Sequence, residues 1–117
     1  MRALLVPLAA LLLPAAAAAA DGTYTFHLAQ DPANLPDCIA MAPSFELPYT
    51  LTMSGGIGTL TSSGGINITM SPSSADKYHG VFELSGERLD YTAVLGPTTT
   101  LSVVGNNLGC RWLANAD

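Results

Sequence analysis

Residues 45–61 read FELPYTLTMSGGIGTLT, and this stretch indicates the fold class of the whole chain. Apolar residues occupy every second position from residue 45 to residue 53, and this period predicts a β-strand with one buried face. Gly55 and Gly56 then predict a tight turn into a second strand over residues 57–61. The side chains that we expect on the buried face of the first strand are Phe45, Leu47, Tyr49, Leu51 and Met53.

The same alternation continues on both sides of this stretch. Short runs of alternating residues are separated by segments rich in Gly, Ser, Pro and Asn, which are typical of turns. Short connections favour antiparallel neighbours, so the sequence predicts an all-β meander of seven or eight strands. We expect it to close into a small barrel, with a two-sheet sandwich as the alternative. Further strands are predicted near residues 24–28, 66–70, 78–84, 89–95, 101–103 and 108–112, with turns or loops at 62–65, 71–76, 86–87, 96–97 and 105–107.

The first twenty residues have the features of an export signal. Arg2 precedes a leucine- and alanine-rich run that ends in small residues at Ala18 to Ala20. This order predicts a cleavable signal peptide over residues 1–20 and a single β domain over residues 21–117. A retained anchor is the alternative, but the run is short and interrupted by Pro7 and Pro14. We therefore expect a periplasmic or secreted protein of the bacterial envelope, with no membrane span after cleavage.

The chain has two cysteines, Cys38 and Cys110, and both follow the predicted leader. An isolated pair in an oxidising compartment is typical of a structural disulfide. A redox pair would have the Cys-x-x-Cys spacing, and a thiolate metal site would need more ligands nearby. The sequence therefore predicts a Cys38–Cys110 disulfide that ties the last strand to the segment after the first.

Composition excludes several classes of partner. Without Arg2, three basic residues stand against nine acidic ones, a formal net charge of −6. Nucleic-acid binding needs clustered Lys and Arg, so we expect no nucleic-acid partner. Attraction to an anionic membrane surface is excluded for the same reason. The acidic balance instead favours a basic protein as partner.

No motif predicts catalysis, and we expect neither an enzyme nor a cofactor. His27 and His79 lie on the outer face by strand parity, and no three ligands converge to predict a metal site. The glycine clusters are followed by no predicted helix, so they indicate turns rather than a phosphate loop. Glu87 and Asp90 flank a predicted turn, where we expect their carboxylates to be solvated.

The segment from residue 29 to residue 44 breaks the strand pattern, and it contains several prolines around Cys38. We expect one helical turn over residues 37–41. A connection of this length is either a plug over one end of the core or a binding loop. The residues that we predict for a binding loop are Asp31, Asn34, Leu35, Asp37, Ile39 and Met41.

These observations predict a small exported binding module without catalytic activity. It would be either a protein inhibitor or a carrier of an apolar small molecule, which requires a hollow interior. The alternative is a structural or assembly component of the envelope that acts through exposed strand edges.

Overall fold

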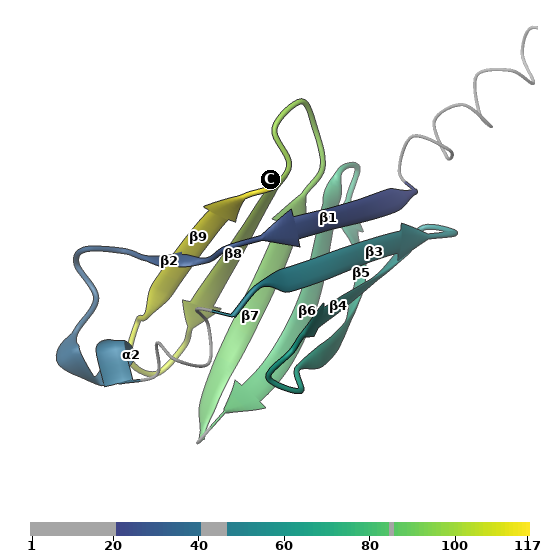
Figure 1. Ribbon diagram of the computed structural model, residues 1–117. Helices are drawn as coiled ribbons and strands as arrows, with labels where there is room; N and C mark the ends of the chain where they lie inside the picture. Colours follow the sequence, from purple (N-terminus) through teal and green to yellow (C-terminus); the bar gives the residue numbers. More distant parts are fainter. Residues whose placement is uncertain (1–20, 41–46, 85) are drawn as a thin grey trace, which may run out of the picture.

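The computed structural model describes residues 21–40, 47–84 and 86–117, and these residues form nine strands and one short helix (Figure 1). The predicted signal peptide and the candidate residue Met41 lie outside the described residues, as does Phe45. The elements are β1 (Gly22–Phe26), β2 (Ala29–Gln30), α2 (Pro36–Ala40), β3 (Tyr49–Ser54), β4 (Ile57–Ser62), β5 (Asn67–Ser74), β6 (Lys77–Leu84), β7 (Glu87–Val94), β8 (Thr100–Gly105) and β9 (Arg111–Asn115).

All strand pairs are antiparallel, in the order β1-β3-β4-β5-β6-β7-β8-β9-β2. The predicted all-β class and the meander from β3 to β9 are therefore confirmed. The sheet curls into a half-barrel, and one stretch of chain bonds to both of its margins (Figure 1). β1 pairs with β3, whereas β2 pairs with β9, and a bridge joins Phe26 to Ala116. The backbone N–H of Asp117 adds a bond to the carbonyl of Thr25.

The inward side chains follow the predicted parity. Large residues from opposite sides of the curl fill the interior, and Trp112, Tyr49, Tyr91 and Phe26 are the largest of them. Two inward glycines, Gly58 and Gly80, allow close packing between strands. A Cβ built on Gly58 would lie 2.8 Å from Met53 Sδ, and one built on Gly80 would lie 2.5 Å from Ile68 Cγ2. The core is therefore filled by side chains at these positions, as is normal for a protein interior.

The predicted turn at Gly55 and Gly56 joins β3 to β4. Both residues have a positive φ, at 63° and 84°. This conformation suits the two central residues of a primed hairpin turn, and glycine adopts it without a steric penalty. The sequence stretch that indicated the fold class therefore forms a hairpin with a two-residue turn, and its first strand pairs with β1.

Three local predictions were wrong. Residues 71–74 continue β5 rather than forming a loop, with a register shift between Pro72 and Ser74. The two residues of β2 pair with β9, although they were predicted as part of the long loop. Leu47 is exposed instead of inward-facing, because β3 begins only after Pro48, which has no N–H to donate to a ladder. Of these differences, β2 accounts for the ninth strand.

Candidate functional site

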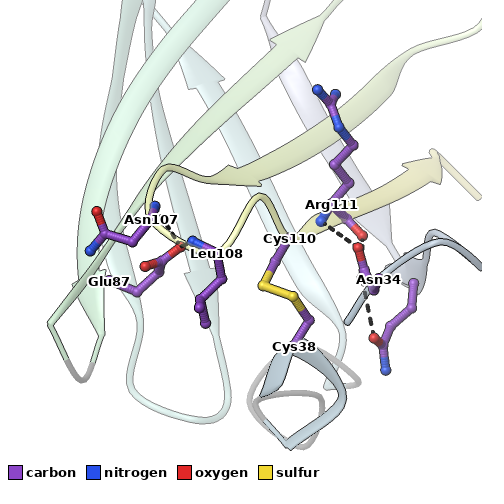
Figure 2. Close-up of a disulfide and its surroundings, with 8 residues drawn as sticks. Asn34, Cys38, Glu87, Asn107, Leu108, Cys110 and Arg111 are labelled. Atoms are coloured by element: carbon purple, nitrogen blue, oxygen red, sulfur yellow. Dashed lines mark hydrogen bonds between the residues drawn. A yellow bond between two sulfur atoms is a disulfide. The ribbon is translucent and has the colours of Figure 1, made fainter. Parts of the chain in front are cut away.

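The predicted disulfide is confirmed, and it holds α2 against one end of the sheet. Cys38 lies in α2 and Cys110 lies directly before β9, and both side chains are fully buried. Their Cα atoms are 5.5 Å apart across 72 residues of sequence. Figure 2 shows the bridge at the centre of this region, with the turn between β8 and β9 on one side and Asn34 on the other. The inner side of α2 thus belongs to the core through Cys38.

A second clamp lies at Asn34, one of the residues predicted for a binding loop. The side-chain Nδ2 of Asn34 donates to the carbonyl of Arg111 at 2.8 Å, and the backbone N–H of Arg111 donates to Asn34 Oδ1 at 2.9 Å (Figure 2). A side-chain amide here takes the place of a paired strand residue. Asn34 Nδ2 also bonds Gln30 Oε1 at 3.2 Å. The side chain of the half-buried Asn34 therefore fastens the segment before α2 to β9.

Asp31 shapes the approach to α2. Its Oδ1 accepts a bond from the Ala33 N–H at 2.8 Å, and its carbonyl accepts one from the Asn34 N–H at 3.0 Å. This is the local turn that an aspartate side chain commonly stabilises. The N–H of Asp31 donates to the Arg111 carbonyl, so this turn too is fastened to β9. Asp31 itself remains exposed.

The remaining described residues of the predicted binding loop lie in α2 or directly before it. Leu35 and Ile39 are 56 % and 55 % exposed. Ile39 lies in α2, and Leu35 directly precedes the helix, where its carbonyl accepts bonds from the N–H groups of Cys38 and Ile39. Asp37 is exposed as well, and Pro36 occupies the first helical position, which tolerates its missing N–H. We call Leu35, Asp37 and Ile39 the α2 surface.

One residue at this end was not found from the sequence: Glu87 is buried, although it was predicted to be solvated. It is the first residue of β7 and only 4 % exposed. Its Oε2 accepts bonds from the N–H groups of Asn107 (3.0 Å) and Leu108 (2.9 Å), as Figure 2 shows. A tight turn leaves such N–H groups without strand partners, and a carboxylate satisfies them with charge-assisted bonds. The signal in the sequence was the shared parity of Glu87 with inward Leu89 and Tyr91.

An open groove of about 430 Å³ lies between α2 and two turns, the one between β6 and β7 and the one between β8 and β9. Asp37 and Ala40 of α2 line one side, and Leu84, Glu87 and Leu108 line the other. A separate groove of about 440 Å³ runs over the outer face of β2, β9 and β8, where Pro32, Val104 and the 57 % exposed Leu113 lie.

Asp90 is also less exposed than predicted, because it is the centre of a polar cluster. His79 Nε2 lies 2.8 Å from its Oδ1, and Asn106 Nδ2 donates to its Oδ2 at 2.7 Å. Arg88 lies 3.5 Å from Oδ1. Partial burial acts to raise the pKa of Asp90, but the bonds from His79 and Asn106 and the charge of Arg88 outweigh it and lower the pKa. The cluster joins β6, β7 and the turn after β8.

The chemistry of the interior is that of a packed core. The hydroxyls of Tyr49 and Tyr91 lie 3.3 Å apart, and the ring centroids lie 6.0 Å apart. Burial raises the pKa of both phenols, so both stay neutral at physiological pH. Within residues 21–40, 47–84 and 86–117, no three His, Cys, Asp or Glu side chains lie together as metal ligands.

No protein-family model, curated protein or solved structure matches this chain. In the described part of the chain, no helix has both the length and the apolarity needed to cross a bilayer.

Proposed function

We propose that this protein is an exported, non-catalytic binding module that contacts a partner protein through the α2 surface. The observation that carries the proposal is the pair of exposed apolar side chains, Ile39 in α2 and Leu35 directly before it, on a segment that the Cys38–Cys110 disulfide holds against the sheet. An apolar pair on a rigid support loses little conformational entropy when it is buried by a partner. In protein interfaces a few well-buried side chains supply most of the binding energy.

Two features support the proposed compartment. A buried disulfide is typical of proteins that fold in an oxidising environment. The first twenty residues have the composition of a signal peptide. Together they support a periplasmic or secreted location, and the bond network between residues 25–30 and β9 supports a closed barrel in that compartment.

The partner that fits best is a basic protein. Asp37 lies between Leu35 and Ile39 in the sequence, Asp31 precedes them, and all four residues are exposed. With nine acidic residues in the chain, long-range attraction would speed encounter with a cationic surface. An inhibitor of a basic enzyme is one such role. A carrier of an apolar molecule is supported less, because large side chains fill the interior.

The alternative, an envelope component that adds strands to a partner, has weaker support. β1 and β2 come from one stretch of chain and bond to both margins of the sheet, which leaves less edge for strand addition. Among the described residues, β6 beyond His79 has no ladder partner in β5, and Val81 there is 40 % exposed. This segment is the edge to test.

The experiment uses three variants of the full-length protein, exported and purified with the disulfide intact. Wild-type protein, L35D/I39D, L113D and V81D are each immobilised, and binding of cationic envelope proteins is measured against salt concentration. We expect a saturable partner whose affinity falls at least about tenfold, or about 1.4 kcal/mol, in L35D/I39D and falls with salt. L113D is the matched control, because Leu113 is as exposed as Leu35 and Ile39, and we expect it to keep binding.

The outcomes separate the candidates. Loss in V81D alone would support strand addition instead. Loss in L113D alone would move the contact to the groove over β9. Equal binding by all four proteins, or no saturable binding by wild type, would contradict the proposal.

A further inference from the structure

The buried carboxylate of Glu87 uses only one of its two oxygens within the described part of the chain. Oε2 accepts the bonds from the N–H groups of Asn107 and Leu108, whereas Oε1 accepts no bond from a described residue. No basic side chain of residues 21–40, 47–84 and 86–117 lies within 4 Å of this carboxylate. Glu87 is nevertheless only 4 % exposed. A buried charge is normally paired, because its removal from water is costly, so Glu87 retains the capacity to bind a cation.

The turn that Glu87 holds does not by itself account for a charge at this position. Figure 2 shows Glu87 beside the turn that carries Asn107 and Leu108. A neutral glutamine oxygen could accept the same two bonds without burying a charge. The surroundings also make room for the carboxylate, since a Cβ built on Gly105 would lie 2.5 Å from Glu87 Oε2. Residues that break a local rule in this way are concentrated at functional sites.

The groove of about 430 Å³ beside this carboxylate has apolar walls and charges of one sign. Its apolar lining residues are Leu84 and Leu108, which are half-buried, and Ala40 on α2. Its charged lining residues are Glu87 and the exposed Asp37, and no basic residue is among the described residues that line it. Asp37 belongs to the α2 surface as well, so the groove and that surface are continuous. We call this groove the α2 groove.

We propose that the α2 groove receives an arginine side chain of the basic partner. The inference rests on the proposed function, because it names the group by which that partner is recognised. The guanidinium pairs with the free Oε1 of Glu87 and with Asp37, and its methylene stem lies on the apolar walls. Arginine fits better than lysine, because a guanidinium is less strongly hydrated than an ammonium and its planar fork can bond two acceptors.

Both sides of the groove are held in place before binding. The two turn amides fix the carboxylate of Glu87, and the Cys38–Cys110 disulfide holds α2 against the sheet. A partner therefore loses little conformational entropy of this protein when its arginine enters. Arginine is also one of the residues that most often dominate the binding energy of protein interfaces.

The first test uses the full-length protein, exported and purified with its disulfide intact. The probe is n-butylguanidinium, which has the head group and stem of an arginine side chain. It is titrated into ¹⁵N-labelled protein, and backbone amide shifts are followed by NMR. The N–H groups of Asn107 and Leu108 report on the site directly, because they bond Glu87. We expect saturable shifts at these amides with a dissociation constant of about 1–10 mM, and none with the neutral isostere n-butylurea.

Three variants assign the binding to the α2 groove. Glu87→Gln removes the charge but keeps an acceptor for the turn amides, and we expect it to weaken binding at least about fivefold. Asp37→Asn changes an exposed residue, so it serves even if Glu87→Gln does not fold, and we expect a loss of about threefold. Asp76→Asn is the matched control. It removes an exposed carboxylate from the turn between β5 and β6, away from the groove, and should bind as wild type does.

The second test measures binding of the cationic envelope partner to the same variants. We expect Glu87→Gln and Asp37→Asn to weaken this binding and Asp76→Asn to retain it. If wild type binds the probe at the groove but no partner is found, the result supports the cation site and contradicts the proposed function.

Three results would overturn the inference. In the first, wild type shows no saturable shift with n-butylguanidinium, or it binds n-butylurea equally well. In the second, Asp76→Asn loses as much affinity as Glu87→Gln, which would indicate a general effect of net charge. In the third, a partner that requires Leu35 and Ile39 binds Glu87→Gln and Asp37→Asn as tightly as wild type. The proposed function would then stand without the groove.

Discussion

Asn34 and Arg111 are 77 residues apart in the chain, and the side-chain amide of Asn34 bonds both backbone polar groups of Arg111. Asn34 thus occupies the place of a strand partner beside Arg111 at the edge of β9, although Asn34 itself does not lie in a strand. Together with the disulfide at Cys38, it fastens the segment around α2 at two points. The α2 surface is thereby presented on a support that belongs to the sheet.

The first prediction concerns this amide. Asn34→Ala removes two bonds to Arg111, and we expect the free energy of unfolding to fall by about 1–2 kcal/mol, because each bond contributes about 1 kcal/mol. Denaturant unfolding measures the change. Asn115→Ala, at an exposed position of β9, serves as control and should stay within about 0.5 kcal/mol of wild type. Similar losses in both variants would contradict the role of the amide.

The second prediction concerns the disulfide. Reduction, or Cys38→Ser with Cys110→Ser, frees the ends of a loop that spans 72 residues. In the chain-entropy model this lowers the stability by about 4 kcal/mol. Urea unfolding with and without reductant measures it. Hydrogen exchange should show that residues 34–40 open first, and uniform protection of the reduced protein would count against the clamp.

The third prediction concerns Glu87. Glu87→Ala leaves the N–H groups of Asn107 and Leu108 without their acceptor, and we expect a loss of about 2 kcal/mol. Glu83→Ala, which removes an exposed carboxylate from β6, is the control. Thermal and denaturant unfolding of both variants provide the comparison. If Glu83→Ala were as damaging as Glu87→Ala, the effect would be one of net charge rather than of the turn.

The fourth prediction is a pH dependence centred on Asp90. Its pKa is lowered in the folded protein from a usual value of 3.8, so the folded state binds fewer protons than the unfolded state near that pH. The stabilisation is present above the unfolded pKa and is lost as the pH falls through the folded one. We expect Asp90→Asn to be less stable than wild type at pH 7 and the difference to shrink below about pH 4. A difference that is constant with pH would contradict this.

The sequence determined much of the fold by local pattern. Alternation of period two assigned Tyr49, Leu51 and Trp112 to the interior, and the structure has each of them there. The disulfide could be predicted because the chain has two cysteines, so each has one possible partner. These inferences succeeded because a strand places successive side chains on opposite faces whatever its neighbours are.

The candidate site was less accessible from the sequence. The segment from residue 29 to residue 44 was identified as exceptional. Its sequence did not show that the side chain of Leu35 is exposed whereas that of Asn34 bonds to β9. Glu87 was predicted to be solvated, because a residue beside a turn is usually exposed to solvent. Its position in the strand alternation, however, is the same as that of the inward Leu89 and Tyr91. The turn amides that hold it lie 20 and 21 residues further along the chain.

Tertiary structure alone decided which residues meet. The sequence contains the threonines of β1, β3, β4 and β5, but only the register aligns them into rows. It also contains Asn34 and Arg111, but only the curl of the sheet and the disulfide bring them together. The physical reason is that the direction of a side chain depends on its own backbone, whereas its partners depend on strand pairings between distant parts of the chain.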